Sequence, residues 1–135
     1  MSDCNLNPTQ NARDAAVKKA KAAGHAVVYG QPHILQLDLD SHAQWEKARN
    51  LIRHFSGHIG VKKVEWTQSK SGGWHFYVWL AHPMERLTRI FWQAALGSDR
   101  TREALNWLWA EAGNEGECFL VEMLPLEYQE LKWRR

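Results

Sequence analysis

Apolar and polar residues alternate along four stretches of the chain, with the period of two that is typical of strands that bury one face. In the first stretch the leucines share one face, and Asp38 and Asp40 share the opposite one. Every other stretch likewise has an apolar side that is suited to packing against helices. The predicted strands are His33–Asp40, Val61–Gln68, Trp74–Ala81 and Cys118–Leu124.

Between these stretches, apolar residues recur at helical spacing, and capping or breaking residues bound them. Ser41 is suited to an N-cap, Pro83 to a first helical turn, and Gly97 to the end of a helix. The predicted helices are Asn11–Ala23, Ser41 to about Phe55, Pro83–Leu96 and Arg100–Ala112. We expect His25–Tyr29 to form a short strand or an extended lead-in, and Ser69–Gly73 to be the turn of a hairpin.

The order of these elements is strand, helix, strand, strand, helix, strand, with one helix in front. This order predicts an α+β fold, in which an antiparallel βαββαβ sheet of the RRM-like (RNA-recognition-like) or ferredoxin-like type follows an N-terminal helix. In that topology the first, third and fourth strands lie side by side, helices cover one face of the sheet, and the other face is open. We interpret residues 1–135 as one domain, with an N-terminal helical extension (1–30) and a core (31–125).

Composition narrows the classes of function. A chain of 135 residues has the length of a single domain, which excludes a multi-domain polymerase or helicase. The net charge of +2 is too small for the whole surface to attract nucleic acid, so a polyanion must meet a local patch. Two cysteines are too few for a disulfide framework or a zinc cage of cysteines, and the chain starts without an apolar signal segment. A cytoplasmic protein that is not inserted in a membrane is expected.

Four chemically active side chains fall on the polar sides of strands that the predicted topology makes neighbours. Asp38 and Asp40 project from the first predicted strand, His75 from the third, and Glu122 from the fourth. Adjacent carboxylates repel one another unless a cation lies between them, and Mg²⁺ or Mn²⁺ prefers such oxygen ligands. With Glu122 as a third carboxylate, the set suits a pair of metal ions about 3.5–4 Å apart, of the kind that promotes phosphoryl transfer.

Other residues near this predicted site are suited to binding nucleotides and strands. The hairpin turn offers hydroxyl groups, an ammonium group and unhindered backbone N–H groups, which together resemble a phosphate cradle. Tyr77 and Trp79 fall on the polar, open side of their strand, where aromatic rings can stack on bases. Candidate groups for triphosphate or template binding are Ser69, Lys70, Ser71, Arg89 and Arg102.

Three short motifs in this order resemble those of the archaeo-eukaryotic primase superfamily. They are Leu37-Asp38-Leu39-Asp40, Gly73-Trp74-His75 and Val121-Glu122-Met123. The stretch from Asp38 to Leu80 is similar to the polymerase domain of bacterial end-joining ligases, and the whole resemblance covers about Ile34–Leu124.

The resemblance implies a primase-polymerase that transfers nucleotides from NTP or dNTP to a DNA or RNA strand by a two-metal mechanism. Asp38, Asp40 and Glu122 would be the catalytic metal ligands for Mg²⁺ or Mn²⁺, and His75 would contact the phosphates of the incoming nucleotide. The family usually has a larger N-terminal unit, and this sequence has no zinc module, Walker loop or helicase region. De novo priming would then require partners such as a helicase or other replication proteins, or would have been lost.

Two alternatives stay open at this point. A non-catalytic module of the RNA-recognition type would bind a single strand or a nucleotide through Tyr77 and Trp79. A regulator would keep the fold for contact with a partner protein. A simpler interpretation also exists for single residues, because Asp40 is equally suited to capping the helix that begins beside Ser41.

Overall fold

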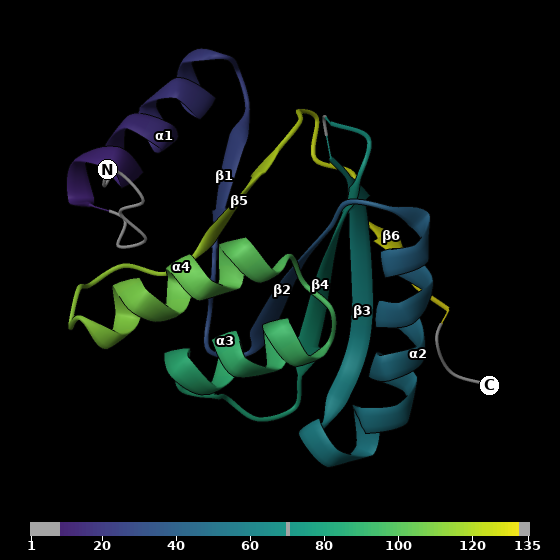
Figure 1. Cartoon of the computed structure of the whole chain (residues 1–135). Coiled ribbons are helices and arrows are strands. Elements are labelled where there is room, and N and C mark those ends of the chain that lie inside the picture. The colour runs from purple at the N-terminus through teal and green to yellow at the C-terminus, as the bar shows by residue number, and fades with distance from the viewer. Residues whose placement is uncertain (1–8, 70, 133–135) are drawn as a thin grey trace.

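The computed structural model describes residues 9–69 and 71–132, and in this part the chain forms four helices and two antiparallel sheets (Figure 1). The fold class is α+β, as the order of elements predicts. The elements are α1 (Gln10–Ala22), β1 (Ala26–Tyr29), β2 (Ile34–Leu39), α2 (His42–Ile59), β3 (Val61–Gln68), β4 (Trp74–Leu80), α3 (Arg86–Ala95), α4 (Arg100–Glu111), β5 (Phe119–Glu122) and β6 (Gln129–Glu130). None of the helices in the described ranges is long and apolar enough to span a bilayer.

The larger sheet has the strand order β2-β4-β3-β6, with antiparallel pairing throughout. Its register aligns Asp38 on β2 with His75 on β4, and His75 with Thr67 on β3. Since alternate residues of a strand face opposite sides, these three side chains form one row across the polar face of the sheet.

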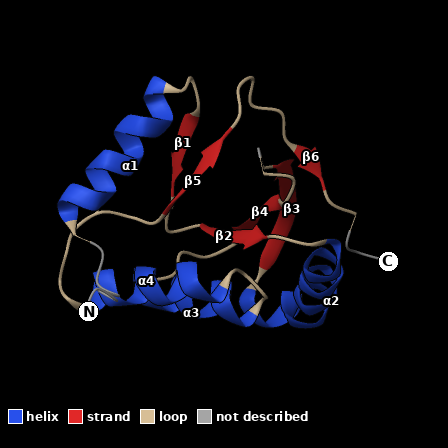
Figure 2. Ribbon diagram, turned by 45° about the horizontal axis from the view of Figure 1, so that its top comes forward, coloured by secondary structure: helices blue, strands red, loops and turns tan. Residues whose placement is uncertain are grey.

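The apolar face of this sheet packs against α2 and α3, and Figure 2 shows α2, α3 and α4 along that side. The helix α2 begins with a capping box, in which Ser41 and Gln44 each accept a hydrogen bond from the other's backbone N–H. Trp45 on α2 places its ring edge-to-face against Trp66 and Phe76 of the sheet. Four of the eight tryptophans of the chain, Trp45, Trp66, Trp74 and Trp92, pack against this core.

The last predicted strand pairs differently from the expectation. We expected it beside the first strand of the main sheet, but β5 pairs with β1 in a separate two-stranded sheet, with Glu122 opposite Ala26. Figure 2 shows this pair, with α1, on the side of the main sheet opposite the other three helices. The side chain of Gln36 donates to the carbonyl of Val28 (3.0 Å) and so connects the two sheets. The predicted open face is thus partly covered by β1 and β5.

Side chains of the α3–α4 region occupy the edge of β2 where β5 was expected. The backbone N–H of Gln36 donates to Gln93 Oε1, and that of Asp38 donates to Ser98 Oγ, each over 2.9 Å. The guanidinium of Arg102 donates to the carbonyl of Gln36 (3.2 Å). These bonds satisfy backbone groups that a neighbouring strand would otherwise pair, which explains why β5 does not join the sheet. The opposite edge, along β3, carries the unpredicted strand β6.

Candidate functional site

Three of the predicted site residues meet on the polar face of the main sheet. The Nε2 atom of His75 lies 3.5 Å from Oδ1 of Asp38, and its Nδ1 atom lies 3.1 Å from Oε1 of Glu122. The Nδ1 contact is an ion-pair distance without the alignment of a hydrogen bond. The imidazole thus lies between two carboxylates that are 84 positions apart in the sequence, from strands of different sheets.

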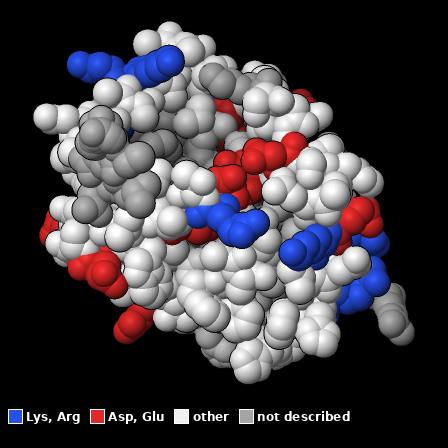
Figure 3. All heavy atoms as spheres, viewed as in Figure 1, with Lys and Arg blue, Asp and Glu red and all other residues white. Residues whose placement is uncertain are grey.

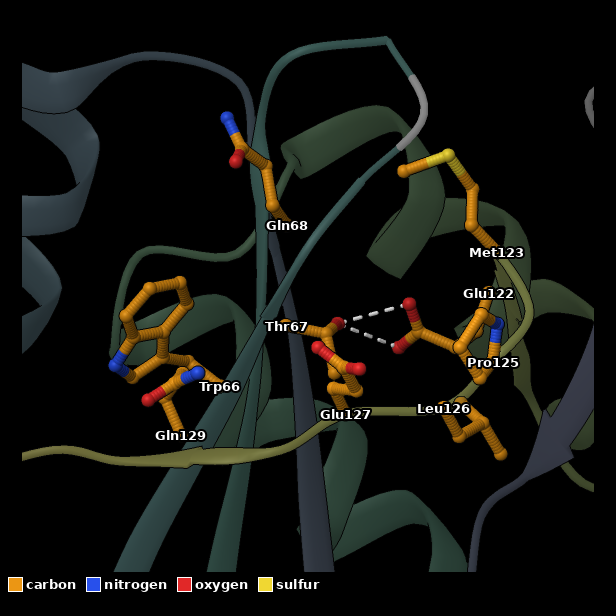
Figure 4. A pocket seen from close by; sticks show the side chains of 9 residues that line it. All are labelled: Trp66, Thr67, Gln68, Glu122, Met123, Pro125, Leu126, Glu127 and Gln129. Atoms are coloured by element: carbon orange, nitrogen blue, oxygen red, sulfur yellow. Dashed lines mark hydrogen bonds between the residues drawn. The ribbon is translucent and has the colours of Figure 1, made fainter.

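Glu122 is buried, and both of its carboxylate oxygens accept hydrogen bonds. Its side chain is only 1% exposed. The hydroxyl of Thr67 lies 2.8 Å from both carboxylate oxygens, and the hydroxyl of Tyr77 donates a short hydrogen bond to Oε2. Figure 4 shows Thr67 and Glu122 pointing toward one another beside a cavity of about 270 Å³.

The electrostatics of this cluster favour a charged imidazole. Burial by itself lowers the pKa of His75, but the carboxylates of Asp38 and Glu122 outweigh it and raise the pKa to about 9. Burial raises the pKa of Asp38, and the contact with His75 more than compensates, so that this pKa is lowered overall. Burial and the carboxylate of Glu122 raise the pKa of Tyr77. At neutral pH the cluster consists of an imidazolium held by two carboxylates, with Tyr77 as a neutral donor.

Asp38 and Asp40 are the accessible carboxylates of the site. The Asp38 side chain is 31% exposed, and Asp40 is exposed at the end of β2. The pKa of Asp40 is raised by partial burial and by the nearby charges of Asp38 and Asp99. These two side chains fit the oxygen-donor chemistry of Mg²⁺, which proteins often bind through one or two carboxylates and the phosphates of a substrate. No group of three or more His, Cys, Asp or Glu side chains within residues 9–69 and 71–132 is arranged to hold a metal ion.

The position of His75 changes the role expected for Glu122. The predicted set has Glu122 sharing a metal pair with Asp38 and Asp40. In the structure the imidazole ring lies between Glu122 and Asp38, so an ion that bridges these two carboxylates requires the ring to move. As folded, Glu122 orients and stabilises His75.

The predicted phosphate cradle lies next to the end of β2, but one of its hydroxyls is used internally. Ser69 is buried, and its Oγ accepts a hydrogen bond from the N–H of Gly73 (2.9 Å) and lies 3.1 Å from Oγ of Ser71. Lys70, predicted to supply the ammonium group, lies outside the described residues. Of the described hydroxyls in this turn, the exposed Ser71 is the better placed to meet a ligand.

Gly73 brings this turn into close contact with β2. A Cβ atom at this position would lie 2.4 Å from the carbonyl oxygen of Leu39 and 3.3 Å from Cα of Asp40. We expect Gly73→Ala to destabilise the protein by about 1–3 kcal/mol, because the added methyl group overlaps backbone that cannot rotate away. The free energy of unfolding from urea denaturation measures this. Gly57→Ala is the control, since a Cβ there meets no atom within 4 Å, and equal stability of the two variants would contradict the prediction.

Two arginines predicted to bind nucleotide or template are instead used inside the fold. Arg89 is 3% exposed and forms a two-point ion pair with Glu117 (2.8 and 3.1 Å). Arg102 donates to Gln36, to the carbonyl of Phe119 and to Glu103. Neither guanidinium is free to meet a ligand in this conformation.

The two aromatic residues proposed for base stacking differ in accessibility. Tyr77 is 2% exposed and packs edge-to-face against the ring of Tyr128, so its faces are closed to a base. Trp79 is partly exposed, but Lys63 covers its ring at 5.0 Å and Glu65 accepts a hydrogen bond from its indole N–H (2.9 Å). The prediction that Tyr77 offers an open ring for base stacking is therefore wrong, because Tyr128, in the segment that follows β5, covers it.

Thr67 and Asp99 also belong to the site, although neither was predicted from the sequence. Alternation along β3 places Thr67 on the polar face, and its register position opposite His75 is the signal that brings it to Glu122. The backbone N–H of Asp99 donates to the carbonyl of Asp38 (2.8 Å), and only the tertiary fold makes these two residues adjacent.

Comparison of the chain with protein-family models, curated proteins and solved structures finds no match.

Proposed function

We propose that this protein is a metal-dependent nucleotidyltransferase of the primase-polymerase type, which transfers nucleotides from NTP or dNTP to a DNA or RNA strand. The observation that supports the proposal is the meeting of Asp38, His75 and Glu122, one residue from each of the three motifs, within 3.5 Å. Residues distant in the sequence have no reason to converge in this way if each were only a solvated strand residue.

In this proposal, Asp38 and Asp40 hold Mg²⁺ or Mn²⁺ together with the phosphates of the bound nucleotide. Asp38 lies on β2 and Asp40 directly follows its end, and both carboxylates are accessible. The bound ion supplies charge neutralisation at the triphosphate during nucleotidyl transfer. The catalytic set is therefore Asp38 and Asp40, with Glu122 acting through His75.

His75 supplies a positively charged hydrogen-bond donor next to the metal-binding carboxylates. Because Glu122 faces Nδ1, the Nε2 side of the ring is directed toward Asp38 and the accessible part of the site. Charge-assisted hydrogen bonds to phosphate oxygens are stronger than neutral ones, so this donor suits the phosphates of an incoming nucleotide. The function of Glu122, Thr67 and Tyr77 is to hold that ring in place.

The test is Mn²⁺-dependent incorporation of labelled nucleotides on primed and unprimed strands. We expect the double variant Asp38→Ala/Asp40→Ala to incorporate nucleotides at least about 100-fold more slowly than the wild-type protein, because it lacks both metal-binding carboxylates. Asp14→Ala is the matched control, since Asp14 is an exposed carboxylate on α1. Absence of incorporation by the wild-type protein with every strand, nucleotide and metal, or equal rates in the double variant, would contradict the proposal.

A second candidate function is a nucleotide-binding module that lacks catalysis. It is favoured by the contacts of Glu122, the third carboxylate of the predicted metal set. Both of its oxygens already contact Thr67, Tyr77 or His75, so neither is free to bind the ion. Calorimetric binding of a Mn²⁺–triphosphate that disappears in the double variant, together with no incorporation by the wild-type protein, would support this function over the first.

A further inference from the structure

A second cavity, of about 610 Å³, opens beside the end of β2 that carries the metal-binding carboxylates. Its walls come from the start of α2, the end of α3 and the segment that leads into α4. Two wall residues also touch β2: Gln44 accepts a hydrogen bond from the N–H of Asp40 (2.6 Å), and the N–H of Asp99 donates to the carbonyl of Asp38 (2.8 Å). The cavity therefore adjoins the backbone of Asp38 and Asp40.

Two cations line this cavity without partners. Lys47 and Arg100 are exposed, and within the described ranges neither side chain makes an ion pair or a hydrogen bond. They contrast with Arg89 and Arg102, whose guanidinium groups are committed to buried contacts. Figure 3 shows that on one face of the molecule acidic side chains gather in a hollow of the surface, with basic side chains next to them.

The remaining polar groups of the described wall include one carboxylate, Asp99, and one exposed hydroxyl, Thr101. The carboxylate of Asp99 accepts the backbone N–H of Arg102 (2.9 Å), which partly satisfies its charge, and the exposed Thr101 adds a hydroxyl group. The volume lies within the range of about 300–1,000 Å³ that is common for small-molecule sites. A ligand that suits these walls carries its negative charge toward Lys47 and Arg100.

We propose that this cavity binds phosphate groups of the nucleic-acid strand or of the nucleotide, through Lys47 and Arg100. The proposal rests on the proposed function, because a metal ion at Asp38 and Asp40 offsets the repulsion between those carboxylates and a neighbouring phosphate. The shared chemistry of the two sources is the phosphate anion. They differ in whether one phosphodiester chain or one triphosphate occupies the cavity.

The experiment measures two kinds of binding with the double variant Lys47→Ala/Arg100→Ala. One arm uses a fluorescein-labelled oligodeoxythymidylate and anisotropy, and the other uses dATP with Mn²⁺ and calorimetry. We expect at least about tenfold weaker binding in the arm whose phosphates occupy the cavity, because two charge contacts are lost. In the oligonucleotide arm, the slope of log affinity against log salt should decrease by about 2.

Lys18→Ala/Lys21→Ala is the charge-matched control, since both lysines are exposed on α1, which does not line the cavity. A loss confined to the oligonucleotide arm assigns the cavity to the strand, and one confined to the dATP arm assigns it to the nucleotide. Unchanged binding in both arms, a loss equal to that of the control, or no binding by the wild-type protein would overturn the proposal. Nucleotide incorporation is measured separately, so that a protein without incorporation but with a cavity-dependent loss of binding contradicts only the proposed function.

Discussion

Replacing Glu122 by alanine is expected to destabilise the fold by about 3–5 kcal/mol, the range observed when one partner of a buried ion pair is removed. The variant leaves the buried imidazolium of His75 without its inner carboxylate. It also leaves the hydroxyls of Thr67 and Tyr77 without an acceptor. Urea denaturation at neutral pH measures the free energy of unfolding.

Two variants separate the parts of this effect. Glu122→Gln retains one acceptor oxygen for the two hydroxyls but removes the charge, so we expect a smaller loss of stability and a decrease in the pKa of His75 from about 9 toward 6.5, measured by NMR titration. Glu46→Ala is the matched control, because Glu46 also faces a histidine, His42 at 3.8 Å, but on the exposed surface of α2. That variant should lie within about 0.5 kcal/mol of wild type. An unchanged His75 pKa in the glutamine variant would show that Glu122 does not hold the ring.

The second large effect is expected at Arg102, which joins β2, α4 and β5. Its side chain is 14% exposed and donates to the backbone carbonyls of Gln36 (3.2 Å) and Phe119 (3.3 Å). Burial by itself lowers the pKa of Arg102, but the buried carboxylate of Glu103 outweighs it and raises the pKa. Arg102→Met is expected to cost about 3–5 kcal/mol, because it leaves the Glu103 charge unpaired and the two carbonyls without this donor.

A double-variant comparison tests the reason for that loss. If the uncompensated charge of Glu103 dominates, then Arg102→Met/Glu103→Gln should be more stable than the sum of the two single changes predicts, by about 0.5–3 kcal/mol. Arg100→Ala, an exposed arginine of the same helix, is the control and should change stability by no more than about 0.5 kcal/mol. Wild-type stability in Arg102→Met would mean that the guanidinium does not hold the two sheets together.

The candidate site was predictable in part, for a specific physical reason. Alternation places Asp38, His75 and Glu122 on polar faces whatever their strands pair with, and β2 and β4 are neighbours as predicted. Burial was not predictable in this way. Tyr77 and Glu122 are closed off because the chain after β5 folds across the sheet, and no local pattern encodes that path.

The amino-acid sequence by itself determined the helices, the strands β2, β3 and β4 of the main sheet and the side that each of these strands presents to the core. These properties depend on residue spacing and capping groups, which act within a few positions of one another. Only the tertiary structure decided that β5 pairs with β1. Backbone groups along the edge of β2 form hydrogen bonds with the side chains of Gln93, Ser98 and Arg102, which lie 57 to 66 positions away in the sequence. Such long-range hydrogen bonds depend on how whole elements pack.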